Sequence, residues 1–203
     1  MIKETTKDNI YLAQFSLSIM PGNLMFMPYA VASVWSYAQT HDDVKEKYDM
    51  KEIFFEKVNP SDTVNSLDNP KVFAFGCYVW NCNHSDAVAQ KVKEKYPKCL
   101  IIYGGPHIPL TANDKWWDEH PYVDVVVYYE GEKRFTKILQ CSSKEEMAMI
   151  PNVSVNLDNG WTFNLDTKSV GKDRIKDLSL IPSPYLLGLF PNPQQNHIPI
   201  MET

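Results

Sequence analysis

A strand–helix–strand unit over residues 71–107 constrains the fold of this chain more than any other stretch. The apolar runs at 72–75 and 100–103 have the composition of strands that are buried on both faces. Between them, Val88 and Val92 recur at helical spacing. Such units are right-handed almost without exception, so the loops after both strands emerge at the same carboxyl edge of a parallel sheet. Ligands of open α/β sheets bind at that edge.

The alternation of strands and helices extends over the first 150 residues. We expect further strands at 10–17, 51–58 and 123–128, helices at 28–39 and 133–140, and short helices within 59–70 and 112–119. This pattern predicts an α/β, flavodoxin-like (Rossmann-like) three-layer sandwich around a five-stranded parallel sheet. With the strands numbered along the chain, the expected order is 2-1-3-4-5, which puts the switch point between the first and third strands.

The pattern changes after residue 150. Two runs of alternating apolar residues flank Asn159 and Gly160, which predicts a β-hairpin with a type I′ turn. Prolines then recur through 181–203, as in an extended linker. We therefore divide the chain into an α/β domain at 1–150, a β-hairpin extension at 151–180 and a proline-rich linker at 181–203.

Composition and motifs exclude several classes of protein. A net charge of −5 without a basic stripe argues against nucleic-acid binding, and no apolar run approaches the length of a membrane span. The four cysteines show no repeated spacing, which is typical of reduced thiols and a cytoplasmic location. Cys77, Cys82 and His84 lack the fourth ligand of a structural zinc site. We find no catalytic triad, paired catalytic carboxylates or HExxH motif, and therefore expect no catalytic residues and no metal held by side chains.

Three loops at the predicted carboxyl edge carry the candidate ligand-binding residues. Gly104 and Gly105 allow close backbone approach to a ligand, or simply make a tight strand exit. The loop after residue 75 offers an aromatic surface for a flat ligand, or ordinary loop packing. The acidic pair around Gly131 suits ligand hydroxyls, or the start of a helix. The candidate cofactor-binding residues are Gly76, Cys77, Tyr78, Trp80, Asn81, Gly104, Gly105, Pro106, His107, Tyr129, Glu130, Gly131 and Glu132.

Several segments together resemble one known family. The segments are IYLAQFSL, LMFMPYAVASVWSYA, VFAFGCYVWN, CLIIYGGPHIP, VDVVVYYEGEKRFTKIL, IPNVSV and LIPSPYL. In this order and spacing, over about residues 8–203, they resemble the cobalamin (vitamin B12)-binding domain that precedes the catalytic domain of B12-dependent radical SAM enzymes. The resemblance implies a flavodoxin-like domain that holds the corrin at the carboxyl edge of its sheet. The metal that such a domain binds is the cobalt of the cofactor.

The resemblance also assigns individual residues. Gly104-Gly105 matches the GG that follows the family's fourth strand, and residues 130–132 resemble its GEGE segment with Tyr129 in place of the first glycine. The family's serine-containing SxL is replaced by Gly76-Cys77-Tyr78. Residues 18–28 contain no DxHxxG motif and no histidine. We therefore expect cobalamin to bind without a histidine from this loop on the cobalt.

The same resemblance places this chain within a larger enzyme. The family's RGCPxxCxxC-type sequence, whose cysteines hold an iron–sulfur cluster, does not occur in these residues. We expect a chain truncated before the radical SAM domain, which would supply the [4Fe-4S] cluster and S-adenosylmethionine in cis or in trans. The chain alone is then not catalytic.

Two other functions stay open. The first is a stand-alone flavodoxin-like domain that binds a flavin or a nucleotide, because two serines follow the first strand. The second is a signalling receiver, which ranks last because Gly76 and Cys77 stand where a phospho-acceptor aspartate is needed.

Overall fold

The computed structural model describes residues 6–19, 24–112, 114–168, 174–190 and 197–200. Among these residues, seven strands form one main sheet in the order β4-β1-β5-β6-β7-β8-β9. The strands are β1 (Asp8–Ala13), β4 (Tyr48–Phe54), β5 (Pro70–Gly76), β6 (Leu100–Gly104), β7 (Val125–Val127), β8 (Val153–Leu157) and β9 (Gly160–Asn164). The predicted α/β class with a parallel-dominated sheet is confirmed.

The predicted number of five strands is wrong. Strands β4, β1, β5, β6 and β7 are parallel neighbours, in the arrangement expected for the five predicted strands. Strands β8 and β9 then continue the same sheet in antiparallel orientation, so the full order extends beyond 2-1-3-4-5. The physical reason is the open edge of β7, whose backbone N–H and C=O groups find partners in the hairpin that follows it in the chain.

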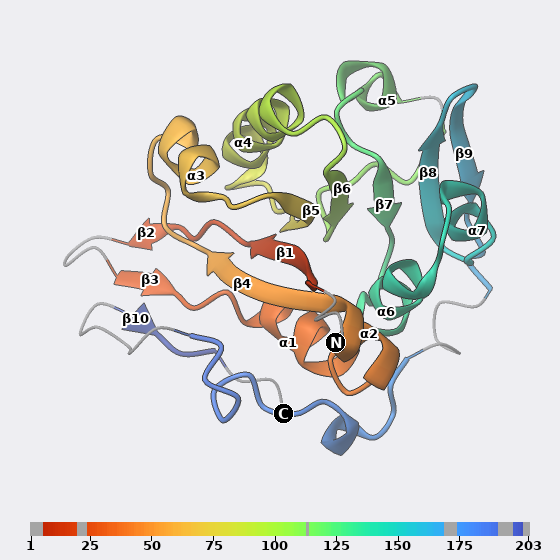
Figure 1. Cartoon of the computed structure of the whole chain (residues 1–203). Helices are drawn as coiled ribbons and strands as arrows, with labels where there is room; N and C mark the ends of the chain where they lie inside the picture. The colour runs from red at the N-terminus through yellow and green to blue at the C-terminus, as the bar shows by residue number, and fades with distance from the viewer. Residues whose placement is uncertain (1–5, 20–23, 113, 169–173, 191–196, 201–203) are drawn as a thin grey trace, which may run out of the picture.

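Helices cover both faces of the main sheet (Figure 1). On one face lie α3 (Pro60–Ser66), α4 (Cys82–Lys95) and α5 (Trp116–Glu119). On the other lie α1 (Tyr29–Ala38), α2 (Asp42–Lys47) and α6 (Glu132–Gln140), with α7 (Lys144–Ala148) beside β8. A separate apolar cluster fills the space on each side of the sheet, which gives the three layers of a Rossmann-like fold. Within the described ranges, no helix combines the length and apolarity that crossing a membrane requires.

Helix boundaries follow local capping chemistry. The side chain of Asn59 accepts a hydrogen bond from the Ser61 N–H and begins α3, and Ser143 caps α7 through the Glu146 N–H. Helices α2 and α7 were not predicted because each buries only one side chain, Val44 in α2 and Met147 in α7, and one buried position shows no periodicity. Helix α4 starts at Cys82, so Ser85, whose residue type is common at helix N-caps, lies buried inside the helix.

The predicted hairpin is present, but its predicted turn type is wrong. Strands β8 and β9 pair from Val153–Asn164 to Leu157–Gly160. A type I′ turn needs positive φ at residues 158 and 159, whereas in this part of the described chain only Gly160 has it, with φ of +108°. Glycine therefore takes the left-handed position at the end of the turn, a geometry that other residues adopt only with strain.

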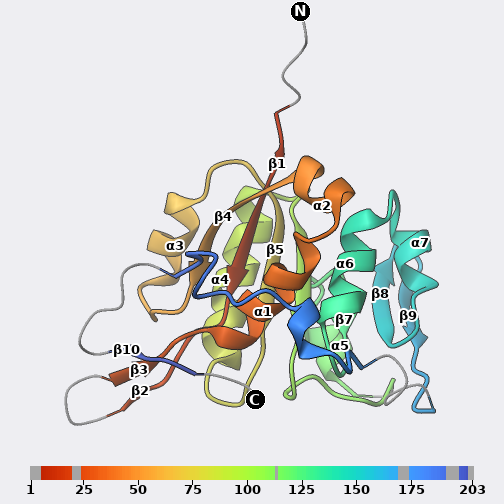
Figure 2. The ribbon, with the colours of Figure 1, turned by 90° about the horizontal axis from the view of Figure 1, so that it is seen from below.

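A second sheet contains β2 (Ser18–Ile19), β3 (Leu24–Phe26) and β10 (His197–Ile198), in the order β10-β3-β2. Strands β2 and β3 fall in a segment that was expected to be a loop. Strand β10 pairs with β3 in parallel, which brings residues near the end of the chain beside its beginning. The short 3₁₀ helix η1 (Leu178–Leu180) precedes it. In Figure 2 this blue C-terminal segment lies across the side of the sheet that carries α1.

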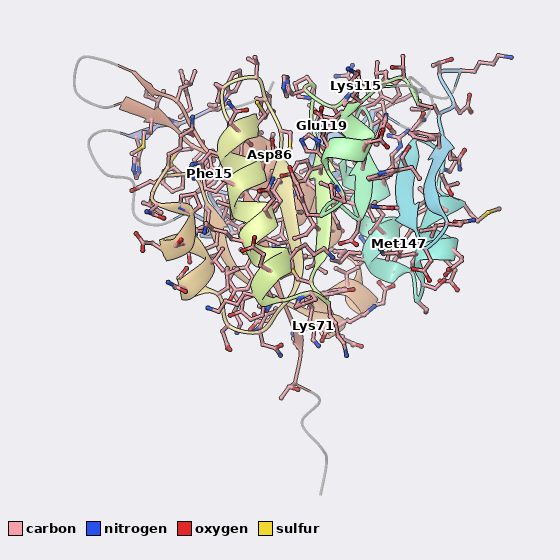
Figure 3. The ribbon with its side chains drawn as sticks, turned by 90° about the horizontal axis from the view of Figure 1, so that it is seen from above. Phe15, Lys71, Asp86, Lys115, Glu119 and Met147 are labelled. Atoms are coloured by element: carbon pink, nitrogen blue, oxygen red, sulfur yellow. The ribbon has the colours of Figure 1, made fainter. Side chains whose placement is uncertain are left out.

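The two ends of the parallel strands form opposite edges of the molecule. In Figure 3, Lys71 at the start of β5 lies at one edge of the molecule. Lys115, in the segment between β6 and α5, lies at the opposite edge. That second edge is the carboxyl edge of the parallel strands, where the candidate loops were expected.

Candidate functional site

A cavity of about 660 Å³ lies at the carboxyl ends of the central strands, on the face of the sheet that α1 and α6 cover. Strands β1, β5, β6 and β7 contribute residues near their ends, and the beginnings of α1 and α6 contribute the facing wall. Its position between β1 and β5 is the switch point of the parallel strands. Crevices at this point are the usual ligand sites of open α/β sheets.

Nine of the predicted cofactor-binding residues line this cavity: Gly76, Tyr78, Gly104, Gly105, Pro106, Tyr129, Glu130, Gly131 and Glu132. They come from three loops that are far apart in the sequence. The other four, Cys77, Trp80, Asn81 and His107, are not among its lining residues. Two of these four hold the loops in place, as their contacts show.

Cys77 joins the loops after β5 and β6 through its backbone. Its N–H donates a 2.6 Å hydrogen bond to the Gly104 carbonyl, and its own carbonyl accepts one of 3.3 Å from the His107 N–H. Gly105 has a φ of +109°, and a Cβ on it would lie 2.5 Å from the Cys77 carbonyl oxygen. Gly105 is therefore required for the close approach of two protein loops. The side chain of His107 is exposed.

The side chain of Asn81 holds the loop after β5 in place through hydrogen bonds to backbone groups. Its Oδ1 accepts a 2.8 Å hydrogen bond from the Tyr78 N–H, and its Nδ2 donates to the carbonyls of Gly76 at 2.9 Å and Phe15 at 3.2 Å. The side chain is buried and fully engaged with backbone. Its role in this structure is to tie the end of β5 to the segment after β1.

Tyr78 and Trp80 form an aromatic surface at the rim of the cavity. Their rings stack with centroids 4.6 Å apart and planes 15° apart, and Lys57 donates to the Trp80 carbonyl at 2.6 Å. Trp80 is 40% exposed and Val79 is 71% exposed, so this loop presents apolar surface to its surroundings. A flat surface of this kind suits a broad, flat ligand.

The segment from Tyr129 to Glu132 is held by Arg134. The buried Arg134 guanidinium donates to the carbonyls of Glu130 at 2.8 Å and Pro151 at 3.0 Å. Tyr129 takes a φ of +61°, in the left-handed region that costs a non-glycine residue about 1–2 kcal/mol. The glycine of the family's GEGE segment would occupy this position without that strain.

Helix α1 supplies cavity residues that were not predicted. Val31, Ser33 and Val34 line the cavity. A Cβ on Gly76 would lie 2.9 Å from Cγ1 of Val31, and one on Gly131 would lie 3.0 Å from Cγ2 of Val34. Two glycines thus allow α1 to pack closely over the strand ends. The amphipathic spacing of 28–39 was visible in the sequence, but it gave no sign that part of its inner face borders a cavity.

The C-terminal segment also borders the cavity. Ile175, Leu178 and Ile181 line it, and Arg174 forms a 3.2 Å ion pair with Glu130 on the opposite loop. Further along, the ring of Tyr185 stacks on Tyr29 with centroids 6.1 Å apart. Because these contacts join residues 44 and 156 positions apart in the chain, they could not be predicted from local patterns.

Burial governs the titratable groups around the cavity. Desolvation raises the pKa of Tyr128 to about 12, and the hydroxyl lies 3.1 Å from that of Ser154. Burial likewise raises the pKa of the Cys77 thiol well above its usual range. These groups are therefore neutral at physiological pH and contribute hydrogen bonding and packing.

The histidines lie away from the cavity lining. The ring of His84 packs edge-on against Phe15, with centroids 4.4 Å apart, and Figure 3 shows Phe15 beside α4. Burial, and then the positive charge of Lys57, lower the pKa of His84. Among the described residues, no group of three or more His, Cys, Asp or Glu side chains is placed to hold a metal ion.

The fold and the cavity together define a Rossmann-like α/β domain with a cavity at the strand switch point. No family model matches the chain. Over 166 residues, or 81% of its length, it is 34% identical to the cobalamin-dependent radical SAM methyltransferase TokK of Streptomyces tokunonensis. It is equally similar to the 2-(S-pantetheinyl)-carbapenam-3-carboxylate methyltransferase of Streptantibioticus cattleyicolor.

The resemblance predicted from the sequence is confirmed. The chain is homologous to part of cobalamin-dependent radical SAM methyltransferases, and its match spans 24% of the length of each of these two relatives.

Proposed function

We propose that this chain is the cobalamin-binding module of a radical SAM enzyme and that it holds the corrin at the carboxyl edge of the main sheet. The cavity at the switch point is the observation that carries this proposal, because it brings together nine of the cofactor-binding residues predicted from the sequence. The homology to cobalamin-dependent radical SAM methyltransferases supports it independently. The parallel strands and the site between β1 and β5 are those of a flavodoxin-like domain.

The residues present fit such a cofactor. A volume of about 660 Å³ lies within the range of small-molecule pockets, roughly 300–1,000 Å³. Val31, Val34 and Val127 supply apolar wall, whereas Ser33 places a buried hydroxyl without a hydrogen-bond partner in the same wall. Apolar lining with a few polar groups is the usual composition of a cofactor site.

Different parts of the site would hold different parts of cobalamin. The cavity would take the nucleotide tail, and the aromatic rim at Tyr78 would adjoin the corrin. Bound cobalamin supplies a cobalt centre that can carry a methyl group. The chain's own residues bind and orient the cofactor: the glycines allow α1 to close over the strand ends, and the apolar wall excludes water.

The rest of the enzyme would lie outside these residues. We propose that a radical SAM domain, in cis or in trans, supplies the [4Fe-4S] cluster and S-adenosylmethionine, and that the assembly works in the cytoplasm. Methyl transfer is the reaction class of the relatives. This chain would take part in methyl transfer only together with that proposed partner domain.

The test is retention of the cofactor. Purified protein incubated with hydroxocobalamin should keep a corrin absorption spectrum through gel filtration. Ala30→Phe, which places a ring in the cavity from α1, should lose this retention. Ala87→Phe, on a half-buried position of α4 outside the cavity, should keep it. Retention of flavin mononucleotide in place of cobalamin would contradict the proposal.

A further inference from the structure

Ser33 carries a buried hydroxyl that the protein itself does not use. Ser33 is 5% exposed and lines the cavity from α1. Its Oγ has no hydrogen-bond partner among the described residues. Ser36, one turn further along the same helix, shows the usual arrangement, because its buried hydroxyl donates a 2.8 Å hydrogen bond to the Ala32 carbonyl.

An unpartnered hydroxyl is costly in this position. Burial without a partner costs about 1–3 kcal/mol, and alanine would fill nearly the same volume without that cost. The neighbours of Ser33 in the cavity wall, Val31 and Val34, are apolar and offer no partner. Thr63 and Ser85 also carry buried hydroxyls without a partner among the described residues, but of these three only Ser33 lines the cavity, where a ligand with a polar atom at this wall would supply the partner.

The apolar cavity wall around Ser33 indicates what kind of atom would be the hydrogen-bond partner of its hydroxyl. A serine hydroxyl donates one hydrogen bond, and rotation about a single side-chain torsion redirects it without moving the backbone. If the cavity holds a nucleotide tail, the polar atom that faces an apolar wall belongs to a heteroaromatic base. A ring nitrogen of such a base accepts a hydrogen bond only when its lone pair is not bonded to cobalt.

We propose that Ser33 donates a hydrogen bond to a ring nitrogen of the cofactor's lower base and thereby selects cobamides whose base carries such a nitrogen. This inference rests on the proposed cobalamin-binding function. It predicts discrimination against cobamides with a phenolic base, which lack the acceptor.

The test compares three ligands on three proteins. Dissociation constants of cobalamin, of p-cresolyl cobamide and of cobinamide, which has no tail, are measured for the wild type, Ser33→Ala and Ser36→Ala by quenching of tryptophan fluorescence. We expect Ser33→Ala to weaken cobalamin binding by about fivefold to tenfold, the usual worth of one neutral hydrogen bond. Binding of cobinamide and of p-cresolyl cobamide should be unchanged. Ser36→Ala should leave the preference for cobalamin intact.

The stability of the ligand-free proteins gives a second readout. Because the Ser33 hydroxyl is unpaired, Ser33→Ala should leave the melting temperature equal or raise it. Ser36→Ala removes a hydrogen bond and should lower it. A melting temperature that falls in Ser33→Ala would show a structural partner and overturn the inference.

The binding results separate the two proposals. Unchanged cobalamin affinity in Ser33→Ala, or an equal loss for all three ligands, overturns the role of Ser33 while cobalamin binding stands. A wild-type protein that binds none of the three ligands overturns the proposed function, and this inference with it.

Discussion

The Cβ that Gly105 lacks would lie 2.5 Å from the carbonyl oxygen of Cys77. This relationship gives the glycine after β6 a structural reason: it allows the loops after β5 and β6 to touch. The Cys77 N–H completes the contact by donating to the Gly104 carbonyl at 2.6 Å. Two sides of the cavity rim are therefore one rigid unit, and disturbing it should affect both stability and cofactor binding.

The first prediction separates this contact from backbone strain. Gly160 has nearly the same φ as Gly105, +108° against +109°, but open space where its Cβ would be. Gly160→Ala should lower the free energy of unfolding by about 1–2 kcal/mol through strain alone. Gly105→Ala adds overlap with backbone and should lower it by about 3–5 kcal/mol. Urea denaturation of both variants measures the difference, and equal losses would show that the loops separate freely.

Asn81 gives the second prediction. Asn81→Ala leaves the Tyr78 N–H and two carbonyls without their partner, so the free energy of unfolding should fall by about 2–4 kcal/mol. Asn83→Ala, at an exposed position in the first turn of α4, should change the free energy of unfolding by less than about 0.5 kcal/mol. Denaturant titration tests both. A neutral Asn81→Ala would mean that the loop after β5 is held by other contacts.

Cysteine reactivity gives the third prediction. Burial raises the pKa of Cys99 to about 12 and that of Cys77 well above its usual range. A rise of about three units lowers the thiolate fraction on the order of a thousandfold, so both thiols should resist iodoacetamide at pH 8. Partly exposed Cys82 should react first. Mass spectrometry of labelled native protein checks the order, with unfolded protein as the control in which all four react.

The fourth prediction concerns acid stability. The folded-state pKa of His84 lies below its ordinary value of 6.5, so the unfolded chain binds the proton more tightly. The stability contribution of the neutral ring is therefore present above about pH 6.5 and is lost as the pH falls through the folded-state pKa. His84→Phe should lose less stability than the wild type between pH 7 and pH 5. His107→Phe, at an exposed position, should show the same pH dependence of stability as the wild type. If the stability of all three proteins changed equally with pH, the acid sensitivity would not come from His84.

The fifth prediction concerns the lower face of cobalt. Neither His84 nor His107 lines the cavity, and residues 10–40 contain no histidine. The electron paramagnetic resonance spectrum of the cob(II)alamin complex should therefore lack nitrogen splitting from a protein imidazole. Splitting that disappears in His84→Ala or in His107→Ala would identify that residue as a ligand.

The local elements and their order were determined by the sequence itself. The sequence has apolar runs at 72–75 and 100–103, helical spacing between them and alternation around Gly160. Each pattern reflects burial within a few residues, so the βαβ unit and the hairpin were predictable. The glycines after β5 and β6 were likewise visible as strand exits. These signals also identified nine residues that line the cavity.

Only the tertiary structure decided how distant segments meet. Contacts between segments far apart in the chain decide three features of the structure. They decide that β8 extends the sheet, that Ser33 on α1 borders the cavity and that Ile175 closes it. Periodicity tells which face of an element is buried, but it does not tell which partner covers that face. The same holds for Asn81 and Gly105, whose residue types suggested a ligand and whose contacts proved to be with the protein's own backbone. Residue type is a local property, whereas the partner of each polar group or missing Cβ is set by packing.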